Sequence, residues 1–526
     1  MMLKNSTKIL LILLVIVFVG VGGLIVYDQF YRQKDSSDAT TAKEKEKVII
    51  GTTSISGGIY PNCAPDSGEL AFNSNVFEPL VTFNRDNKIM PVLAIKWDNP
   101  DDNTWRFYLS PNAKFSNGTK VTAEDVKFTY DYILKDTSLP VVPLLPQATI
   151  SVIDEETVEF KTQAPDPLLL NRLAVGFLVM SKIEVEANGL KNNIGSGPYL
   201  LSEYSEQQKI LQRNENYWST LPKVKTVVYK LYQGDNKTEN LLNGEVDFIV
   251  YGFSKSDPDY DRVAAAVAEK KIQSNKVLSP MMVYLDLDAL REKTPYVNTE
   301  KNPFLDTRVR KAIYQAIDIN SVTEETNGVK LSQMAYAGLF GYDPTIQRPA
   351  FDVNAGLSLM KEAGYENGFE MTIDHTPSPE LEPFYIMIAE QLKKINITVK
   401  MASEEPDKFF EKVASKDTSA YILGFNADTK DVSEVLDGLL HTPTGAYGQY
   451  SLGYSNPEVD KLIEACSQTL NQQIRQQRIQ AAMEAGMTDV AKIPLFQIYI
   501  NYAYDNDISW SPRLDGLVKP TEMAGK

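Results

Sequence analysis

The stretch Ala420–Asp428, AYILGFNAD, alternates large apolar residues with small or apolar ones and ends with two polar residues, Asn426 and Asp428. The alternation is typical of a buried strand. A carboxylate just beyond the carboxyl end of a strand lies where open α/β sheets bind ligands. The simpler interpretation is that Asp428 is a turn residue or a helix cap. We predict that it supplies the charge that holds a solute in a cleft between two lobes.

The sequence contains no recognisable catalytic motif. A phosphate-binding Walker A loop, a G-x-S-x-G elbow and an H-E-x-x-H helix are all missing. His375 and His441 are the only histidines, too few and too isolated for a catalytic triad or a zinc site. Cys63 and Cys466 are too far apart to suggest a disulfide framework or metal spacing, and Cys466 is expected to be a buried free thiol on a helix. We predict a binding protein with no catalytic residue, metal or cofactor.

Length and charge narrow the class further. A chain of 526 residues is too long for one hydrophobic core, so two or three lobes are expected. The formal net charge of −16 argues against a nucleic-acid partner, because a phosphate backbone requires clustered lysine and arginine.

The N-terminal region predicts a membrane anchor. Ile9–Tyr27 is uncharged and nearly all apolar, and a helix of that length just crosses the hydrocarbon core. A cleaved signal peptide is the alternative, but the run is long for one and no small-residue cleavage site follows. Residues 1–27 are therefore expected to be a cytoplasmic stub and transmembrane helix, residues 28–47 a flexible linker, and the body extracytoplasmic.

The body alternates strands and helices. Around Asp428 the order strand–helix–strand–helix–strand predicts a parallel sheet with crossover helices. Gly, Pro and Ser in residues 54–73 predict a loop that could line a site, and Thr122 with Asp125 three residues later predicts a capped helix. The other principal expectations are helices at Asp306–Asn320, Asp352–Ala363, Ser378–Ile395, Asn456–Leu470 and Gln472–Ala491, and strands at Val48–Thr53, Val224–Tyr232, Val246–Tyr251 and Leu495–Ala503.

Several stretches together resemble the extracytoplasmic solute-binding proteins of peptide/nickel-type ABC importers, the dipeptide/oligopeptide-binding family 5. Their order and spacing cover nearly all of residues 48–526. The matching stretches are Phe77–Leu80 (FEPL), Pro91–Thr129, Gly195–Tyr199 (GSGPY), Arg213–Trp218 (RNENYW), Asp306–Asp318, Lys361–Phe369 (KEAGYENGF), Gly424–Asp428 (GFNAD) and Tyr454–Ile463 (YSNPEVDKLI).

The resemblance implies an α/β, two-lobed periplasmic-binding-protein fold of the large class with an extra subdomain. Lobe I would comprise residues 48–85, 195–283 and 497–526, its subdomain residues 86–194, and lobe II residues 284–496. The chain departs from the family at the usual lipid-anchor cysteine, which is missing, and at Phe425, where tryptophan is usual.

In peptide-binding members the carboxylate equivalent to Asp428 pairs with the α-amino group of the ligand. A buried ammonium needs such a partner, and main-chain hydrogen bonds can hold an extended peptide whatever its side chains. The implied ligand-binding residues are Asp428, Phe425, Asn426, Ser67, Gly68, Glu69, Tyr251, Phe253 and Tyr284.

The implied function is capture of a short peptide, or a similar small solute, and delivery to ABC permease subunits with cytoplasmic ATPases. We expect a monomer that is tethered to the cell membrane. The alternatives are a membrane-anchored peptide sensor of the same fold, a binder of a non-peptide solute such as a nickel chelate, and an extracytoplasmic hydrolase.

Overall fold

The computed structural model describes residues 42–53, 55, 61, 67–135, 139, 141–142, 145–191, 193–232, 236–252, 257–444, 448 and 451–526. The predicted anchor Ile9–Tyr27, Cys63 and Phe253 lie outside these residues, as do the side chains of Ser67–Glu69. No helix in the described part of the chain is long and apolar enough to cross a membrane.

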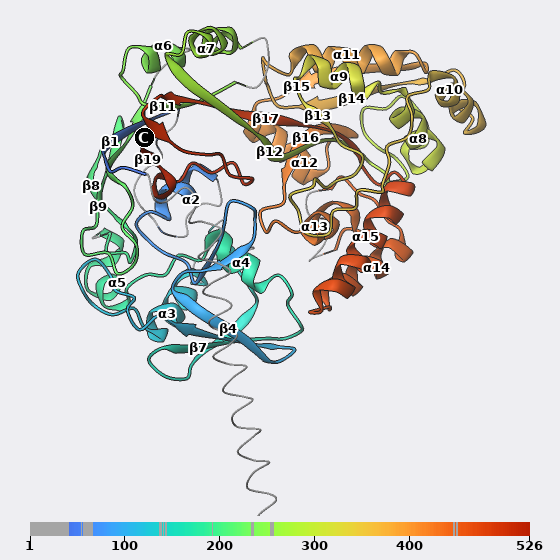
Figure 1. The fold of residues 1–526 in the computed structure, drawn as a ribbon. Helices are drawn as coiled ribbons and strands as arrows, with labels where there is room; N and C mark the ends of the chain where they lie inside the picture. Colours follow the sequence, from blue (N-terminus) through green and yellow to red (C-terminus); the bar gives the residue numbers. More distant parts are fainter. Residues whose placement is uncertain are drawn as a thin grey trace, which may run out of the picture.

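One mixed sheet, with eleven strands among the described residues, passes through the whole molecule (Figure 1). Strands from distant parts of the sequence are neighbours in this sheet, so the sheet connects the two halves of the molecule. The order is β15 (Ile397–Ser403), β14 (Phe369–His375), β16 (Ala420–Asn426), β12 (Ile272–Leu287), β17 (Ile493–Asp505), β11 (Phe248–Tyr251), β1 (Lys45–Thr52), β10 (Val224–Leu231), β9 (Gln208–Arg213) and β8 (Tyr199–Tyr204), with β13 (Val329–Lys330) paired to β17.

Two long antiparallel strands, β12 and β17, belong to both halves of the molecule. They pair from Ile272 opposite Asp505 to Leu285 opposite Ile493, with a register shift between Leu278 and Met282. In Figure 1 they run from the half that contains β1 and β11 into the half that contains β14 to β16. The two halves are therefore linked by continuous hydrogen-bonded strands.

The half that contains Asp428 has the predicted parallel arrangement. Strand β14 is parallel to both β15 and β16, and α11 (Glu382–Lys393) and α12 (Pro406–Ser415) make the connections. Strand β16 then pairs antiparallel with β12. The remaining helices here are α8 (Thr307–Ala316), α9 (Ile319–Glu325), α10 (Val353–Glu362), α13 (Val432–Val435), the π-helix η4 (Leu436–Leu440), α14 (Pro457–Ser467), α15 (Gln472–Thr488) and the 3₁₀ turn η3 (Pro303–Leu305).

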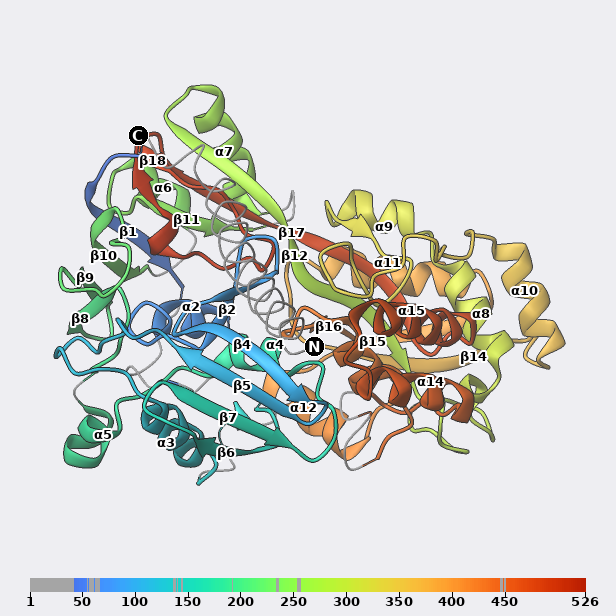
Figure 2. The ribbon, with the colours of Figure 1, turned by 60° about the horizontal axis from the view of Figure 1, so that its bottom comes forward.

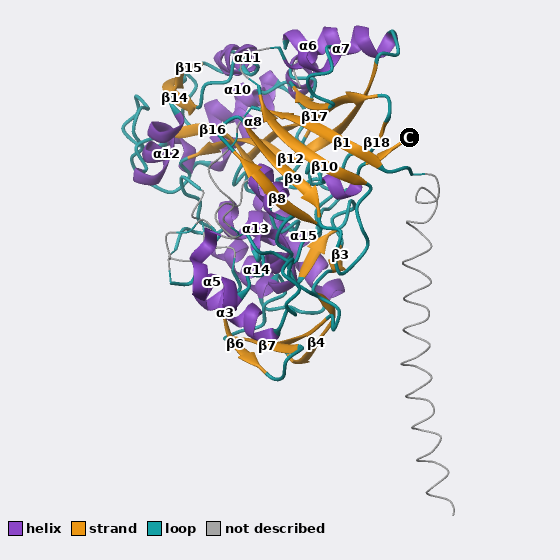
Figure 3. Cartoon of the chain, turned by 90° about the vertical axis from the view of Figure 1, so that its left-hand side faces the viewer, coloured by secondary structure: helices purple, strands orange, loops and turns teal. Residues whose placement is uncertain are grey.

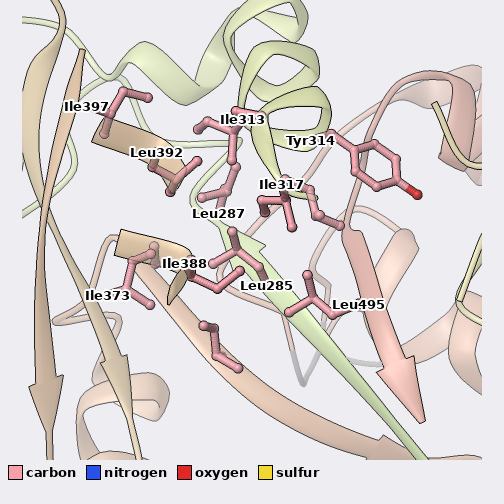
Figure 4. Packing of buried hydrophobic residues seen from close by; sticks show 14 of the residues in the cluster. Leu285, Leu287, Ile313, Tyr314, Ile317, Ile373, Ile388, Leu392, Ile397 and Leu495 are labelled. Atoms are coloured by element: carbon pink, nitrogen blue, oxygen red, sulfur yellow. The ribbon is translucent and has the colours of Figure 1, made fainter. Parts of the chain in front are cut away.

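A hydrophobic core fixes the helices of this half to the sheet. Ile313 of α8 and Ile388 of α11 are fully buried, and both belong to the same cluster as Leu285 of β12 (Figure 4). Cys466, on α14, is a buried free thiol as predicted. The apolar stripe expected for residues 306–320 therefore does pack on the sheet, as helical periodicity indicated.

Two helix boundaries differ from the sequence prediction. Helix α8 ends at Ala316, because Asp318 is extended and its side chain accepts a hydrogen bond from the Asn320 N–H to cap α9. Helix α11 begins at Glu382 instead of Ser378. A start at Pro379 would have placed Pro383 in the helix interior, where its missing N–H and its ring break a turn.

The other half carries a second, smaller sheet. Figures 2 and 3 show its antiparallel strands grouped beside α3 and apart from the main sheet. The side chain of Asp125 accepts the Thr122 N–H, so the predicted cap of α3 is confirmed. The elements are β4 (Ala94–Asp101), β5 (Thr104–Leu109), β7 (Thr157–Thr162), β6 (Ala148–Val152), α3 (Ala123–Ile133), α4 (Leu169–Gly176), α5 (Lys182–Asn188) and the 3₁₀ turn η2 (Gly189–Lys191); nearby lie α2 (Ser67–Asn73), α6 (Lys237–Leu242), α7 (Pro258–Ala268), η5 (Pro520–Glu522), and the pairs β2 (Val81–Phe83) with β3 (Ile89–Pro91) and β18 (Ile508–Ser509) with β19 (Ala524–Gly525).

The sequence prediction missed two features of this half. Residues 67–73, expected to be loop, form helix α2. Strand β1 begins at Lys45, inside the predicted tether, and its charged end is accommodated by ion pairs from Lys45 to Asp507 and from Lys225 to Glu46. A hydrophobicity pattern does not detect a strand end that is held by charge pairs.

A buried ion pair ties β12 to the residue that precedes β17, and its loss is expected to be costly. Lys492 Nζ lies 2.5 Å from Asp286 Oδ1, with both side chains completely buried. Lys492→Met should lower the free energy of unfolding by about 3 kcal/mol, because it leaves a buried carboxylate without its partner. Urea denaturation of the purified protein measures this value.

The matched control is Lys461→Met, since the Lys461–Glu458 pair is mostly exposed. That change should lower the free energy of unfolding by less than about 0.5 kcal/mol. Equal losses in the two variants would contradict the importance given to the buried pair.

Candidate functional site

A cavity of about 650 Å³ lies where the two halves meet. This volume falls within the roughly 300–1,000 Å³ of small-molecule sites. One side is formed by β1, α2, α4 and a segment near the C-terminus, and the other by Asn426, Asp428 and Lys430 of the loop that follows β16. Residues 279–281, at the register shift in β12, also line the cavity.

The sheet positions Asp428 at the cavity wall. Strand β16 pairs with β12 so that Asn426, its last residue, is opposite Met281. Two residues later the chain has left the sheet, and the carboxylate of Asp428 borders the cavity. Gly424 lies close to the Met281 side chain beside this point: a Cβ there would lie only 2.1 Å from the Met281 sulfur, so that flexible side chain would have to move.

The Asp428 side chain is half-buried and has no hydrogen bond or ion pair with any other described residue. Burial raises its pKa, and attraction to the Lys430 ammonium partly opposes that shift. An unpaired carboxylate at an apolar wall is a poor arrangement for stability, because a desolvated charge gains most when it is paired. The geometry therefore suits Asp428 to receive a cationic group from a ligand.

A second carboxyl group, Glu434, holds the loop that carries Asp428. Its Oε2 accepts hydrogen bonds from the Thr429 N–H at 2.8 Å and from the Thr429 hydroxyl at 2.6 Å. Burial, followed by repulsion from Asp428, raises the pKa of Glu434 to about 7. The Thr429 carbonyl accepts a 2.6 Å hydrogen bond from Asn171 of α4, so the same loop also contacts the opposite half.

The structure brings some of the predicted residues together at the cavity and places others elsewhere. Asp428 and Asn426 line it. The backbone of Ser67–Glu69 forms the first turn of α2, whose next residues, Leu70 to Phe72, also line it. The ligand contacts of these residues remain predictions.

Strand alternation separates Tyr251, Phe425 and Tyr284 from the cavity wall, and Phe253 lies outside the described residues. Val250 of β11 lines the cavity, so its neighbour Tyr251 faces the opposite side of the sheet, where it packs in a separate core. Phe425 is likewise turned away from Asn426 and packs with Tyr284 in the core of the second half. Tyr284 is completely buried, and its hydroxyl lies 3.3 Å from that of Tyr421. The rings of Tyr251, Phe425 and Tyr284 do not border the cavity.

Sequence reasoning missed the segment Arg513–Lys519 and Lys209, all of which contribute to the wall. No local pattern marks them, because they reach the site only through the tertiary fold. Arg513, for example, donates to the carbonyl of Phe83, far away in sequence, at 2.9 Å.

Known proteins resemble the chain across most of its length. The family model described as "Bacterial extracellular solute-binding proteins, family 5 Middle" matches residues 88–447. The probable D,D-dipeptide-binding periplasmic protein of Escherichia coli K12 is 25% identical over 510 residues, covering 92% of this chain and 96% of that protein.

Solved structures show the same fold. An ABC transporter substrate-binding protein from Listeria monocytogenes superposes with a TM-score of 0.78 at 20% identity, covering 92% of this chain and 100% of that one. An ABC transporter-associated periplasmic binding protein from Helicobacter pylori, in complex with the peptide STSA, gives a TM-score of 0.72 at 20% identity and covers 92% and 98% of the two chains.

The raised pKa of Glu434 predicts a pH effect on stability. Between about pH 4.5 and 7 the native state holds a proton on Glu434 that the unfolded state has released, so stability should fall as the pH rises through this range. Glu434→Gln keeps an acceptor oxygen for Thr429 but cannot titrate. Its melting temperature should therefore fall less than that of the unmodified protein between about pH 5 and 7.

Differential scanning calorimetry at several pH values measures the difference between the two proteins. Parallel pH profiles would contradict the shifted pKa of Glu434. The comparison isolates this residue from other buried carboxyl groups, because those are the same in both proteins.

Proposed function

The chain belongs to the bacterial extracellular solute-binding proteins of family 5, and on that premise we propose that it captures a short peptide between its halves and delivers it to an ABC permease. The observation that carries the proposal is the unpaired Asp428 carboxylate at the wall of a cavity shared by the two halves. It is suited to the α-amino group of a peptide. The peptide-binding names of similar proteins support the same ligand class.

The proposed mechanism is closure of the two lobes around the solute. The lobes would be residues 48–85, 195–283 and 497–526, with the subdomain 86–194, against residues 284–496. Contacts between the two sides support a closed arrangement: Asn171 donates to the Thr429 carbonyl, and Asn87 Nδ2 donates to the Gly338 carbonyl at 3.2 Å. A ligand that touches both walls shifts the population toward this closed form.

The proposed cellular setting is extracytoplasmic, with the body tethered to the membrane by the N-terminal segment Ile9–Tyr27. Permease subunits with cytoplasmic ATPases would be the partners, and the protein would act as a monomer without catalytic activity. The words "ABC transporter" in the names of two structural neighbours favour import over the sensor alternative.

Peptide binding should raise the melting temperature of the purified protein. A ligand that binds only the native state stabilises it by about 2.7 kcal/mol at a concentration 100 times its Kd. Differential scanning fluorimetry against pools of synthetic di- to pentapeptides, with nickel chelates as a separate arm, measures the effect. A shift with chelates alone, or with neither arm, would overturn the peptide assignment.

Asp428→Asn tests how the ligand is held. The variant should bind peptides with a free amino terminus at least about tenfold more weakly, because a buried charge-assisted hydrogen bond contributes about 1.5–3 kcal/mol. N-acetylated peptides, which have no ammonium, should be affected much less. Isothermal titration calorimetry measures both affinities.

Asp407→Asn is the control, since Asp407 is an exposed residue on α12 that does not line the cavity. It should leave both affinities unchanged. Equal losses for free and acetylated peptides in Asp428→Asn would remove the role given to Asp428.

A further inference from the structure

Four basic side chains line the cavity: Lys209, Lys430, Arg513 and Lys519. A site that receives only an ammonium group has no need of them. Their individual surroundings decide whether any is available to a ligand.

Arg513 is already compensated by its own half of the molecule. Its guanidinium pairs with Asp515 at 2.6 Å and with Glu522 at 2.5 Å, and it also donates to the Phe83 carbonyl. The side chain is 1% exposed. Arg513 therefore holds the segment that follows β18 in place.

Lys209 has aromatic partners of its own, and Lys430 lies on the same side of the cavity as Asp428. The Lys209 ammonium lies 4.4 Å from the ring centre of Phe72 and 5.6 Å from that of Tyr204, in a cation–π arrangement. Lys430 is on the same short loop as Asp428 and attracts that carboxylate.

Lys519 lines the cavity from the half opposite Asp428. Like Lys430, it forms no ion pair with any described residue, and its ammonium has a single long hydrogen bond, 3.5 Å, to the hydroxyl of Thr82. Burial, followed by repulsion from Arg513, lowers its pKa to about 8, while attraction to Asp515 and Glu522 partly opposes that shift. The group is thus still largely protonated at neutral pH.

The cavity therefore presents an unpaired carboxylate, Asp428, and, on the opposite half, the weakly partnered ammonium of Lys519. Asp428 follows β16 in the second half, and Lys519 precedes η5 in the first. Each is costly to desolvate alone. A solute with both an ammonium and a carboxylate group would satisfy the two together and connect the halves.

We infer that Lys519 receives the carboxylate of the ligand, so that the cavity selects zwitterionic solutes with a free amine and a free carboxyl group. The inference rests on the proposed function and adds a second contact between the protein and its ligand, besides the one at Asp428. It also predicts that closure depends on both ends of the solute, because each end is held by a different half.

A comparison of C-terminal acids and amides tests the inference. A defined set of tripeptides is titrated by calorimetry, each as the free acid and as the C-terminal amide, at pH 7. The unmodified protein should bind the acids at least about tenfold more tightly. In Lys519→Met, which keeps the apolar length of the side chain, the two forms should bind with similar, weakened affinity.

Two further variants serve as comparators. Lys223→Met, at an exposed position outside the cavity, should retain the full preference for acids. Lys430→Met should retain it too, because Lys430 is placed beside Asp428. Loss of the preference in Lys430→Met, with its retention in Lys519→Met, would overturn the assignment.

The outcomes separate this inference from the proposed function. Equal binding of acids and amides by the unmodified protein, a result that does not depend on any variant folding, would overturn the role of Lys519 and leave peptide binding in place. Failure of every tripeptide in both forms, and of longer peptides, would overturn both.

Discussion

The pairing of β12 with β17 is the constraint on which the rest of the structure depends. Both strands continue from one half into the other, so neither half can be rotated freely without bending the same two strands. The register shift at Leu278–Met282 lies within this crossing, and residues 279–281 line the cavity. The element that joins the lobes is thus also part of the surface against which a ligand would lie. A solute bound at this wall would therefore contact the strands that link the two halves.

Asp428 differs from the carboxylates of two buried ion pairs in the framework. Asp286 pairs with Lys492 at 2.5 Å, and Asp431 pairs with Arg475 at 2.6 Å. At the cavity wall, the Asp428 carboxylate lacks a partner among the described residues. Since an unpaired buried charge lowers stability, residues that a fold leaves unpaired are candidates for binding a ligand.

Much of the second half could be predicted from the sequence, because its signals are local. Apolar periodicity and capping residues located α8 and α10, and the position of Asp428 followed from the end of an apolar run. The helix boundaries that were predicted wrongly lie where neighbouring sequence signals compete. One example is Asp318, which caps the next helix, α9, instead of continuing α8. Tyr251, Phe425 and Tyr284 lie away from the cavity wall for a related reason: a strand turns adjacent side chains to opposite faces, and sequence proximity does not say which face borders the cavity. The contribution of Lys519 could not be predicted, since only the tertiary fold brings it to the cavity.

The discontinuous wall also has a consequence for biosynthesis. Ile50 to Thr52 come from the start of the body, whereas Arg513 to Lys519 follow every other wall-forming segment in chain order. The ribosome makes the earlier segments first, so the wall lacks part of one side until this final segment has folded back. A chain without it would have an incomplete cavity.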